Sequence, residues 1–401
     1  MRQGWEVKKL GGICEFVRGP FGGSLKKSMF KDSGYAVYEQ QHAIYNQFSS
    51  IRYFVDENKF NEMNRFKLNA GDLIMSCSGT MGKTAIVPQN IKEGIINQAL
   101  LKLTPSEKIN INFLKIWMES PDFQNKINDL SQGAAIKNVA SVKILKEIDI
   151  NLPQIREQKQ IVEVLDKAFA DIDVIKANAE QNLKNTKELF DSYLQNIFSN
   201  PSNDWELSKI KDIGLTQTGS TPKTSDPLNF GNAIPFVKPA DINIDGNGCI
   251  NYKNMGLSEK GKELSRIIPK NSVLMVCIGA TITKIGYSLF DITCNQQINT
   301  VTPKANIDFK FIYYAMSHSS FTSQVLHGAS QATLPIINKS KWETLNILYP
   351  QSLQEQQKIV EKLDNISKEV KLLEEVYKKK IEDCEELKKS LLDKAFKGEL
   401  I

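Results

Sequence analysis

Apolar and small residues recur at alternating spacings of four and three between residues 153 and 199, which predicts a long helix with a coiled-coil seam. The same pattern returns 198 residues later, after an opening of similar sequence. The matching positions are Ile161, Leu165, Ala168, Ile172, Ile175 and Ala179 in the first copy and Ile359, Leu363, Ile366, Val370, Leu373 and Tyr377 in the second. Both copies then carry a polar residue on the seam, Asn182 and Lys380, beside Leu183 and Ile381. The chain therefore uses one helical unit twice.

The repeat extends into the segments between the helices. Trp5-Glu6-Val7 matches Trp205-Glu206-Leu207, AGDLIMSCSGT (70–80) matches KNSVLMVCIGA (270–280), Asn97-Gln98 matches Asn295-Gln296, and GAAIKNV (133–139) matches GASQATL (328–334). An internal duplication of this length indicates the order lobe, helix, lobe, helix. We expect a first lobe at 1–152, a first helix at 153–200, a second lobe at 201–349 and a second helix at 350–401.

Within each lobe, short β-rich runs alternate with turns and one helical patch, which predicts an α+β fold. The β-rich runs are 72–77 and 85–87 in the first lobe and 273–278 and 286–289 in the second, with helical patches at 111–130 and 309–326. We expect a partly open barrel or a sheet with flanking helices. The segment 201–204 should end the first helix, and Gly398 should cap the second.

The length of the helices sets the expected architecture. A helix of about 40 residues spans roughly 60 Å. If the second helix returns antiparallel along the first seam, two similar lobes are separated by a helical spacer and related by a pseudo-two-fold axis. Alternatively, the seams pack in a helical bundle or form a homodimer.

The composition is that of a soluble globular protein, with 41% apolar and 24% charged residues among 401. No apolar run approaches the roughly 18 residues that span a membrane. The first residues lack the apolar core of a signal peptide, so we expect a cytoplasmic protein without a membrane partner. The six cysteines form no CxxC pair, which indicates free buried thiols.

The net charge of +5 is concentrated in the lobes. Residues 1–150 hold 20 Lys and Arg against 15 Asp and Glu, and residues 201–349 hold 14 against 11. Both helical segments are slightly acidic, with 6 against 8 and 11 against 12. This basic excess is a modest indication that the lobes bind nucleic acid.

Motifs for catalysis are missing from the sequence. Gly82-Lys83-Thr84 resembles the end of a phosphate-binding loop, but Cys77 stands where that loop needs glycine, and a β-hairpin turn explains both copies better. There is no Asn/Asp-Pro-Pro-aromatic motif for adenine methylation and no cluster for metal-dependent cleavage. Three scattered histidines are too few for a metal or catalytic site. We therefore expect no catalytic residues, no metal and no cofactor bound by this chain.

The two lobes differ most at residues 18–65 and 217–265, where polar and basic residues gather. Lys and Arg suit phosphate and guanine, and Gln suits the major-groove edge of adenine. Unlike loops on a shared scaffold indicate two readers of different features. The candidate DNA contacts in the first lobe are Arg18, Lys26, Lys27, Gln40, Gln41, His42, Thr80 and Lys83. Those in the second are Thr218, Ser220, Thr221, Lys223, Lys238, Asp241, Thr281 and Lys284.

Over its whole length, the chain resembles the specificity subunits of type I restriction–modification systems. The residues that carry the resemblance are PQIREQKQIVEVLD (153–166), PQSLQEQQKIVEKLD (350–364), TGSTPKTS with IPFVKPADI (218–242), KAFKGEL (394–400) and the two Asn-Gln pairs. One departure is Ile136, which stands where the second copy has Gln331 in a GxxQ-type turn common in the family.

The resemblance implies that each lobe is a target-recognition domain for one half of a bipartite site on double-stranded DNA. It also implies two methyltransferase subunits, which bind S-adenosylmethionine and methylate adenine, and motor-nuclease subunits in the full complex. The helices would act as spacer and docking surface, through Ile161, Leu165, Ile172, Ile175, Ile359, Leu363, Val370 and Leu373.

Two other classes of protein compete with this interpretation. A nuclease or methyltransferase acting alone would need the missing catalytic motifs. A homodimeric coiled-coil adaptor without DNA readout would not need two different lobes with a basic excess.

Overall fold

The computed structural model describes residues 2–130, 139, 141–242, 248–252, 254–330 and 334–401. It contains two compact units, unit 1 at Met1–Ala179 with Lys379–Ile401 and unit 2 at Glu180–Lys378. Each unit combines one lobe with a part of both long helices, α6 (Ile155–Ser199) and α12 (Leu353–Lys397). The packing units therefore divide each long helix, whereas the boundaries drawn from the sequence keep each helix whole. The turn that contains Ile136 and Gln331 lies outside the described residues.

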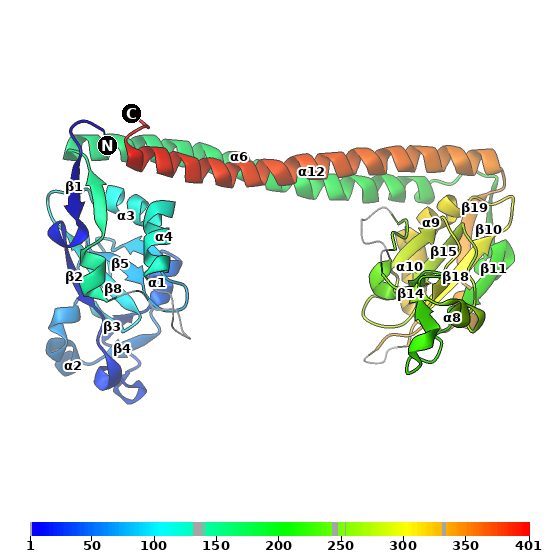
Figure 1. Ribbon diagram of the computed structural model, residues 1–401, viewed down its shortest axis with the longest axis horizontal. Coiled ribbons are helices and arrows are strands. Elements are labelled where there is room, and N and C mark those ends of the chain that lie inside the picture. The colour runs from blue at the N-terminus through cyan, green and yellow to red at the C-terminus, as the bar shows by residue number, and fades with distance from the viewer. Residues whose placement is uncertain (1, 131–138, 140, 243–247, 253, 331–333) are drawn as a thin grey trace. The chain divides into compact units, whose positions relative to one another are not determined.

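Lobe 1 is the part of unit 1 that precedes α6, and it is built on two sheets (Figure 1). Its strands are β1 (Glu6–Lys9), β2 (Cys14–Arg18), β3 (Tyr35–Tyr38), β4 (Tyr53–Val55), β5 (Leu73–Ser76), β6 (Thr84–Ile86), β7 (Gly94–Ile96), β8 (Leu100–Pro105) and β9 (Asp149–Leu152). Its helices are η1 (Leu10–Gly12), η2 (Gly22–Ser24), η3 (Lys27–Met29), α1 (Gln40–Ile44), α2 (Glu57–Glu62), η4 (Asn64–Phe66), α3 (Ile111–Glu119), α4 (Pro121–Asp129) and α5 (Val142–Lys146). The larger sheet is antiparallel with the order β2-β8-β5-β6. The smaller has the order β4-β3-β7, with β3 and β7 parallel, and β1 pairs with β9.

Lobe 2 follows α6 and precedes α12 in the chain, and it repeats this topology. Its strands are β10 (Trp205–Lys209), β11 (Gly214–Thr218), β12 (Phe230–Gly231), β13 (Phe236–Val237), β14 (Gly256–Leu257), β15 (Ser272–Val276), β16 (Ile285–Ser288), β17 (Thr293–Cys294), β18 (Ile298–Pro303) and β19 (Asn346–Pro350). Its helices are α7 (Ile210–Ile213), η5 (Pro227–Asn229), η6 (Pro239–Asp241), α8 (Glu259–Glu263), α9 (Phe309–Ser317), α10 (Ser319–Gly328) and α11 (Lys339–Trp342). The main sheet has the order β11-β18-β15-β16, β13 and β17 pair in parallel, and β10 pairs with β19. The predicted α+β duplication is confirmed for the main sheets, while the three-stranded sheet β4-β3-β7 of lobe 1 is replaced in lobe 2 by the pairs β12-β14 and β13-β17.

Each predicted helical patch is a pair of helices rather than one helix. The break falls at Ser120 in lobe 1 and at His318 in lobe 2, and each side chain caps the helix that follows. Ser120 Oγ accepts the backbone N–H of Phe123, and His318 accepts that of Ser320. An N-cap residue is extended, so it interrupts an apolar pattern that continues through it.

The core of each unit joins the main sheet to the long helices. In unit 1 the sheet residue Met75 and the α3 residue Phe113 belong to one buried cluster with Leu165 of α6 and Phe396 of α12. The rings of Phe113 and Phe396 lie 5.3 Å apart, and those of Phe311 and Phe198 in unit 2 lie 5.5 Å apart. Helix α3 lies between the sheet and the long helices of unit 1 (Figure 1). Each lobe therefore packs on both long helices through equivalent aromatic residues.

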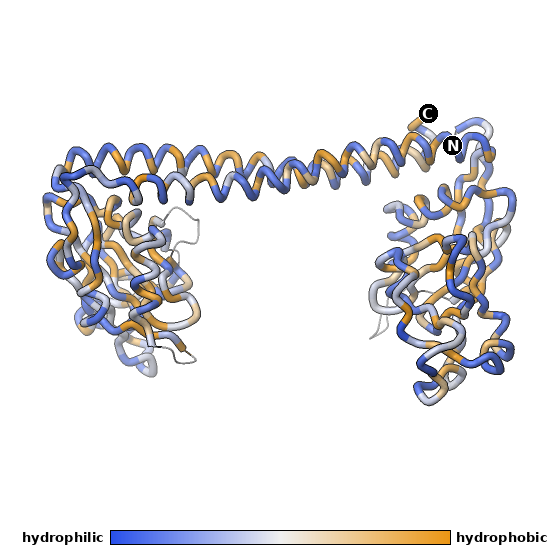
Figure 2. The backbone as a smooth tube through the Cα atoms, turned by 180° about the vertical axis from the view of Figure 1, so that it is seen from behind, coloured by the Kyte–Doolittle hydropathy of each residue, from blue (hydrophilic) through white to orange (hydrophobic). Residues whose placement is uncertain are grey.

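The long helices run antiparallel within each unit. In unit 1, Lys388 Nζ lies 2.5 Å from Asp173 Oδ1, and Lys176 Nζ lies 2.7 Å from Glu385 Oε1. A step of three residues toward the C-terminus of α6 therefore corresponds to a step of three residues toward the N-terminus of α12. In unit 2, α6 and α12 line a common cavity, with Lys187 on α6 and Glu374 on α12 among the lining residues. Figure 2 shows hydrophobic and hydrophilic residues alternating along both helices. Helix α6 ends at Ser199 before Pro201, and Gly398 follows α12 with φ of 76°, as predicted.

The predicted seam is exposed at one position in each copy and buried or half-buried elsewhere. Its buried members are Ile161, Leu165, Ile172, Ala179, Leu363 and Val370, and its half-buried members are Ala168, Ile359, Ile366 and Tyr377. After the polar positions Asn182 and Lys380, which are exposed, it continues through the buried Thr186 and Cys384, again 198 residues apart. Ile175 and Leu373 depart from the pattern in both copies, since they are 42% and 39% exposed.

The Glu-Gln pair at the start of each long helix fixes that helix to its lobe. Glu157 Oε1 accepts the indole N–H of Trp5 at 3.0 Å, and Glu355 Oε1 accepts that of Trp205 at 3.2 Å. Gln158 and Gln356 are fully buried, and their amides bond only to backbone in the described contacts, at Pro153 and Pro350 among others. The most specific motif of the sequence is therefore a structural joint.

Candidate nucleic-acid interface

The turn between β5 and β6 carries Thr80 and Lys83, two of the predicted contacts, and both are exposed. Ser76 Oγ donates to the carbonyl of Thr80 at 2.6 Å and accepts the backbone N–H of Lys83 at 3.1 Å. Gly82 has φ of 75°, a conformation that favours glycine. A phosphate-binding loop leads from a strand into a helix, whereas this turn leads into the antiparallel strand β6. The prediction of a hairpin is confirmed.

The equivalent turn of lobe 2 presents Thr281 but uses its lysine differently. Lys284 is half-buried, and its Nζ donates to the carbonyl of Pro239 at 3.1 Å. This bond ties the hairpin to the segment after β13. Lys238 precedes that proline and is exposed, with its ammonium 5.8 Å from the centre of the Phe236 ring. Lys284 therefore positions a loop, while Lys238 and Thr281 face solvent.

His42 and Asp241 occupy the same turn in the two lobes, and both are buried. Glu39 N donates to His42 Nδ1 at 2.9 Å, and Lys238 N donates to Asp241 Oδ2 at 2.8 Å. His42 Nε2 also lies 3.1 Å from the carbonyl of Ser50, and Asp241 Oδ1 accepts from Asn254 Nδ2 at 2.8 Å. Both side chains form hydrogen bonds that shape the loop after β3 or β13, and a DNA contact through either of them stays a prediction.

The other predicted residues of lobe 1 remain near or at the surface. Lys26 and Lys27 are exposed beside η3, whereas Gln40 and Gln41 are half-buried in α1. Arg18 ends β2 and is half-buried beside the thiol of Cys77. Burial raises the pKa of Cys77 to about 12, and the Arg18 guanidinium partly opposes that rise. Cys77 is therefore an uncharged core thiol.

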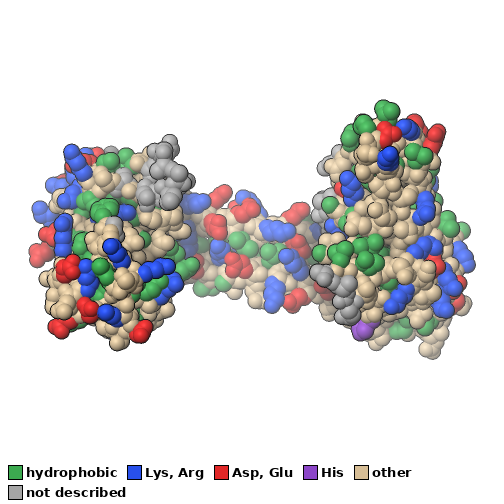
Figure 3. Space-filling view, turned by 90° about the horizontal axis from the view of Figure 1, so that it is seen from below, with side chains coloured by type: hydrophobic (Ala, Val, Ile, Leu, Met, Phe, Trp, Pro, Cys, Tyr) green, Lys and Arg blue, Asp and Glu red, His purple; other side chains and the backbone are tan. Residues whose placement is uncertain are grey.

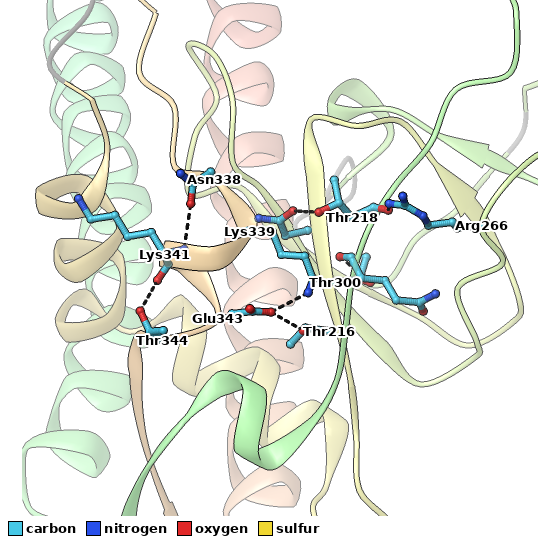
Figure 4. Close-up of polar contacts among 11 residues, drawn as sticks. Thr216, Thr218, Arg266, Thr300, Asn338, Lys339, Lys341, Glu343 and Thr344 are labelled. Atoms are coloured by element: carbon cyan, nitrogen blue, oxygen red, sulfur yellow. Dashed lines mark hydrogen bonds and ion pairs between the residues drawn. The ribbon is translucent and has the colours of Figure 1, made fainter.

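Four of the predicted residues of lobe 2 lie at or just after the end of β11, namely Thr218, Ser220, Thr221 and Lys223. Figure 4 shows Thr218 near Arg266. Thr218 Oγ1 donates to Asn299 Oδ1 at 2.7 Å, which links β11 to β18. Arg266 NH1 donates to the carbonyl of Thr218 at 2.7 Å, and the backbone N–H of Arg266 donates to Ser220 Oγ at 2.9 Å. Thr221 Oγ1 donates to Gln296 Oε1. Lys223 is exposed next along the loop.

Arg266 and Gln296 complete this cluster, and the residue-by-residue reasoning from sequence missed both. Arg266 directly follows the segment 217–265, in which the predicted polar and basic residues of the second lobe gather. Gln296 belongs to the Asn-Gln pair, whose duplication was the signal that could have marked it. Both side chains are exposed.

An acidic group close to the cluster is already paired. Glu343 Oε2 accepts from Thr216 Oγ1 and from Lys339 Nζ, both at 2.7 Å (Figure 4). These hydrogen bonds, that of Lys339 first, hold the pKa of Glu343 below its ordinary value. The carboxylate is therefore largely balanced by Lys339.

The surface of each lobe is polar and mixed in charge. Figure 3 shows Lys and Arg side chains spread over the viewed face of each lobe, with acidic side chains among them. Within the described residues, no group of three or more His, Cys, Asp or Glu is placed to hold a metal ion. Among the described helices, none is both long and apolar enough to cross a membrane.

Comparison with known proteins identifies similar sequences and folds. The sequence model of the type I restriction modification DNA specificity domain matches residues 2–185 and again 202–383. The MjaIX specificity subunit of Methanocaldococcus jannaschii is 30% identical over 182 residues, which is 43% of this chain and 42% of that protein. The putative MjaX specificity subunit of the same organism is 24% identical over 99% of this chain and 93% of its own length.

A solved chain from a study of assembly and conformational transition in a type I restriction–modification system has a similar fold. It superposes with a TM-score of 0.78 at 18% identity and covers 100% of this chain and 99% of its own. The chain thus spans less than half of the MjaIX relative but nearly all of the MjaX relative and of the solved chain.

Proposed function

The chain belongs to the family of type I restriction–modification DNA specificity subunits, and from that premise we propose that each of its lobes reads one half of a bipartite DNA site. The observation that carries this proposal is the combination of one scaffold with unlike loops. The main sheets share their strand order, while the segments after β2 and β11 differ in sequence and contacts. Two copies that bound the same feature would not need different loops.

The long helices are proposed to dock two methyltransferase subunits. Each unit exposes apolar side chains on otherwise polar helices, and these form what we call the helix patches. The unit 1 patch is Val174, Ile175 and Leu387, and the unit 2 patch is Leu372, Leu373 and Leu189. The antiparallel register sets Val174 opposite Leu387, because Asp173 pairs with Lys388.

The helix patches are equivalent under the repeat, since Leu372 and Leu387 lie 198 residues after Val174 and Leu189. Exposed apolar clusters of this kind mark protein interaction sites. Two equivalent patches support two copies of the same partner. Ile175 and Leu373 belong to the patches, whereas the buried members of the set predicted for docking and the coiled coil lie on the seam of the helix pair.

The partner subunits are proposed to supply the chemistry. In this scheme the methyltransferase subunits bind S-adenosylmethionine and methylate adenine, and motor-nuclease subunits join for cleavage. This chain would bind no cofactor of its own and would act in the cytoplasm, where the DNA is. The alternative of a homodimeric adaptor is not favoured, because the coiled-coil seam pairs α6 with α12 of the same chain in each unit.

Mapping of methylated bases tests the proposal. The chain is combined with the methyltransferase subunit encoded with it, S-adenosylmethionine and genomic DNA, and N6-methyladenine is located by sequencing. We expect methylation at an interrupted, asymmetric site by the complex and none by the chain alone. Methyl transfer by the isolated chain, or methylation unrelated to any bipartite site, would contradict the proposal.

A further inference from the structure

In each lobe, an exposed glutamine follows the asparagine of a turn that abuts the loop after the first strand of the main sheet. Asn97 Oδ1 accepts the backbone N–H of Ala99 at 3.0 Å, and Asn295 Oδ1 accepts that of Gln297 at 3.2 Å. These short-range bonds close the turn and leave Gln98 and Gln296 at its tip, exposed in both lobes.

A glycine brings the loop against this turn. A Cβ on Gly19 would lie 1.8 Å from the carbonyl oxygen of Asn97, and one on Gly219 would lie 2.2 Å from that of Asn295. Both contacts are far too short for any side chain, so glycine is required at both positions. The backbone N–H of Gly19 donates to the carbonyl of Leu100 at 2.9 Å, and that of Gly219 donates to the carbonyl of Ile298 at 3.0 Å. The glutamine therefore lies in the same position relative to the start of the loop in both lobes, although the loop sequences differ.

An arginine flanks the same loop. The Arg266 side chain donates to the carbonyl of Thr218, and its backbone N–H donates to the hydroxyl of Ser220. Gln296 accepts from the hydroxyl of Thr221, so Arg266 and Gln296 bracket one short segment. The equivalent position in lobe 1 is Phe66, because the adjoining framework repeats at a separation of 200 residues, and Arg65 stands one position earlier. Arg65 belongs to η4, which packs against β2, the strand that leads to Gly19. Both arginines are exposed.

The remaining hydrogen-bonding capacity of these groups is that of donors. Gln296 Oε1 already accepts from Thr221, which leaves its amide NH₂ as the group to offer. Arg266 uses NH1 on Thr218, and a guanidinium carries five N–H donors in a planar fork. That single bond orients the fork (Figure 4). An anchored guanidinium beside an amide donor suits a phosphate oxygen.

Gln98 and Gln296 are the same in both lobes, so they do not distinguish two different half-sites. The feature that every duplex has in common is the sugar–phosphate backbone. Resting on the proposed function, we propose that Arg266 and Gln296 form a phosphate clamp that holds the DNA backbone beside the loop after β11, and that Gln98 contacts the backbone at the equivalent place in lobe 1. The unlike loops beside them then read the bases.

Salt-dependent binding tests the clamp. The complex of this chain with its methyltransferase subunit is titrated onto a duplex with the methylated site and onto an unrelated duplex, from 50 to 200 mM salt. Arg266→Ala should weaken binding to both duplexes by the same factor. It should also lower the slope of log affinity against log salt by about one, the value for one lost phosphate contact. The methylated sequence should not change.

Two further variants sharpen the test. Gln296→Glu keeps an oxygen that can accept from Thr221 but places a carboxylate next to the phosphate. It should therefore weaken binding to both duplexes at least as much as Arg266→Ala does. Lys304→Ala is the matched control, because Lys304 is exposed and far along the strand from Gln296. Gln296 precedes the start of β18, whereas Lys304 follows its end. It removes the same charge as Arg266→Ala and should leave the salt slope within error. Normal recovery of the methyltransferase with each variant shows that the chain is folded.

The outcomes separate the two proposals. Unchanged affinity and slope in Arg266→Ala and Gln296→Glu, in a wild-type background that methylates a bipartite site, would overturn the clamp alone. A changed methylated sequence in either variant would also overturn the clamp, because it would mean that these residues read bases. Failure of the wild-type complex to methylate any bipartite site would instead contradict the proposed function.

Discussion

The side-chain oxygen of Gln158 accepts the backbone N–H of Asn110 at 2.7 Å, and Gln356 makes the same bond to Asp308 at 2.7 Å. Each glutamine thereby joins the start of a long helix to the segment that leads into α3 or α9. Gln158→Ala would leave the backbone N–H of Asn110, a half-buried residue, without its acceptor. We expect it to lower the free energy of unfolding by about 1–3 kcal/mol, measured by denaturant titration.

The neighbouring Gln160 provides the matched control, because it is exposed on the same helix. Gln160→Ala should change the unfolding free energy by less than about 0.5 kcal/mol. Equal effects of the two substitutions would show that the Glu-Gln motif is not the joint described here.

Stability should fall in mild acid because of His318. This side chain is buried and stacks on Phe198 with 5.3 Å between ring centres, and burial lowers its pKa from the ordinary value of 6.5. Since the unfolded chain binds the proton more readily, the contribution of neutral His318 is present above pH 6.5. It is lost as the pH falls from there through the lowered pKa of the folded state.

His318→Ser should remove this part of the pH dependence, because serine is the capping residue of lobe 1 at this place. The measurement is the unfolding free energy between pH 8 and pH 5. His327→Ser, at an exposed position on α10, is the control and should retain the wild-type profile. A His318→Ser profile as steep as the wild type would assign the acid sensitivity to other groups.

Each helix patch should hold one methyltransferase subunit. Leu387→Lys places a charge in the unit 1 patch and Leu189→Lys does so in unit 2, and burying either charge in an interface is unfavourable. We expect each variant to bind one methyltransferase subunit instead of two and the double variant to bind none, as measured by native mass spectrometry. Glu386→Gln changes the net charge by the same amount as Leu387→Lys, at the adjacent exposed position, and should retain both subunits. Full occupancy in the double variant would place docking elsewhere.

The seam, the duplication and the hairpins could be predicted because each rests on a local periodicity. Ile161 and Leu363 lie on a heptad pattern, and such a pattern leaves few ways to bury its apolar residues. The break at His318 could not be seen, since the apolar pattern continues on both sides of the cap. The break at Ser120 had a signal that was missed, because Ser followed by Pro is typical of a helix start.

The candidate contacts illustrate a different limit. His42 and Asp241 are polar residues in variable loops, as a DNA contact would be, and only the fold shows that their side chains are bonded to nearby loop residues. Arg266 and Gln296 come together from segments 30 residues apart, so no local pattern could join them.

A helical insertion tests the spacer role. The register pairs Lys176 with Glu385, so seven residues added after Ile175 and seven after Glu385 lengthen both helices at one level. Seven residues add about 10 Å, or about three base pairs of B-DNA. We expect unchanged half-sites with a spacer longer by about one to three pairs, and weaker binding because the duplex must twist to compensate. Methylation of sites with the original spacer alone would show that the helices do not set the distance.

The most direct test of the central claim is a chain that carries lobe 1 twice. Residues 5–153 replace residues 205–350, between Asp204 and Gln351, so that Trp5 meets Glu355 as Trp205 does. The copied Phe113 then meets Phe198 in place of Phe396, an equivalent aromatic partner. The positions of N6-methyladenine are mapped after incubation with the methyltransferase subunit and S-adenosylmethionine. If each lobe reads its own half-site, the methylated sequence becomes an inverted repeat of the first half-site. Retention of the original second half-site in an active complex would contradict the account.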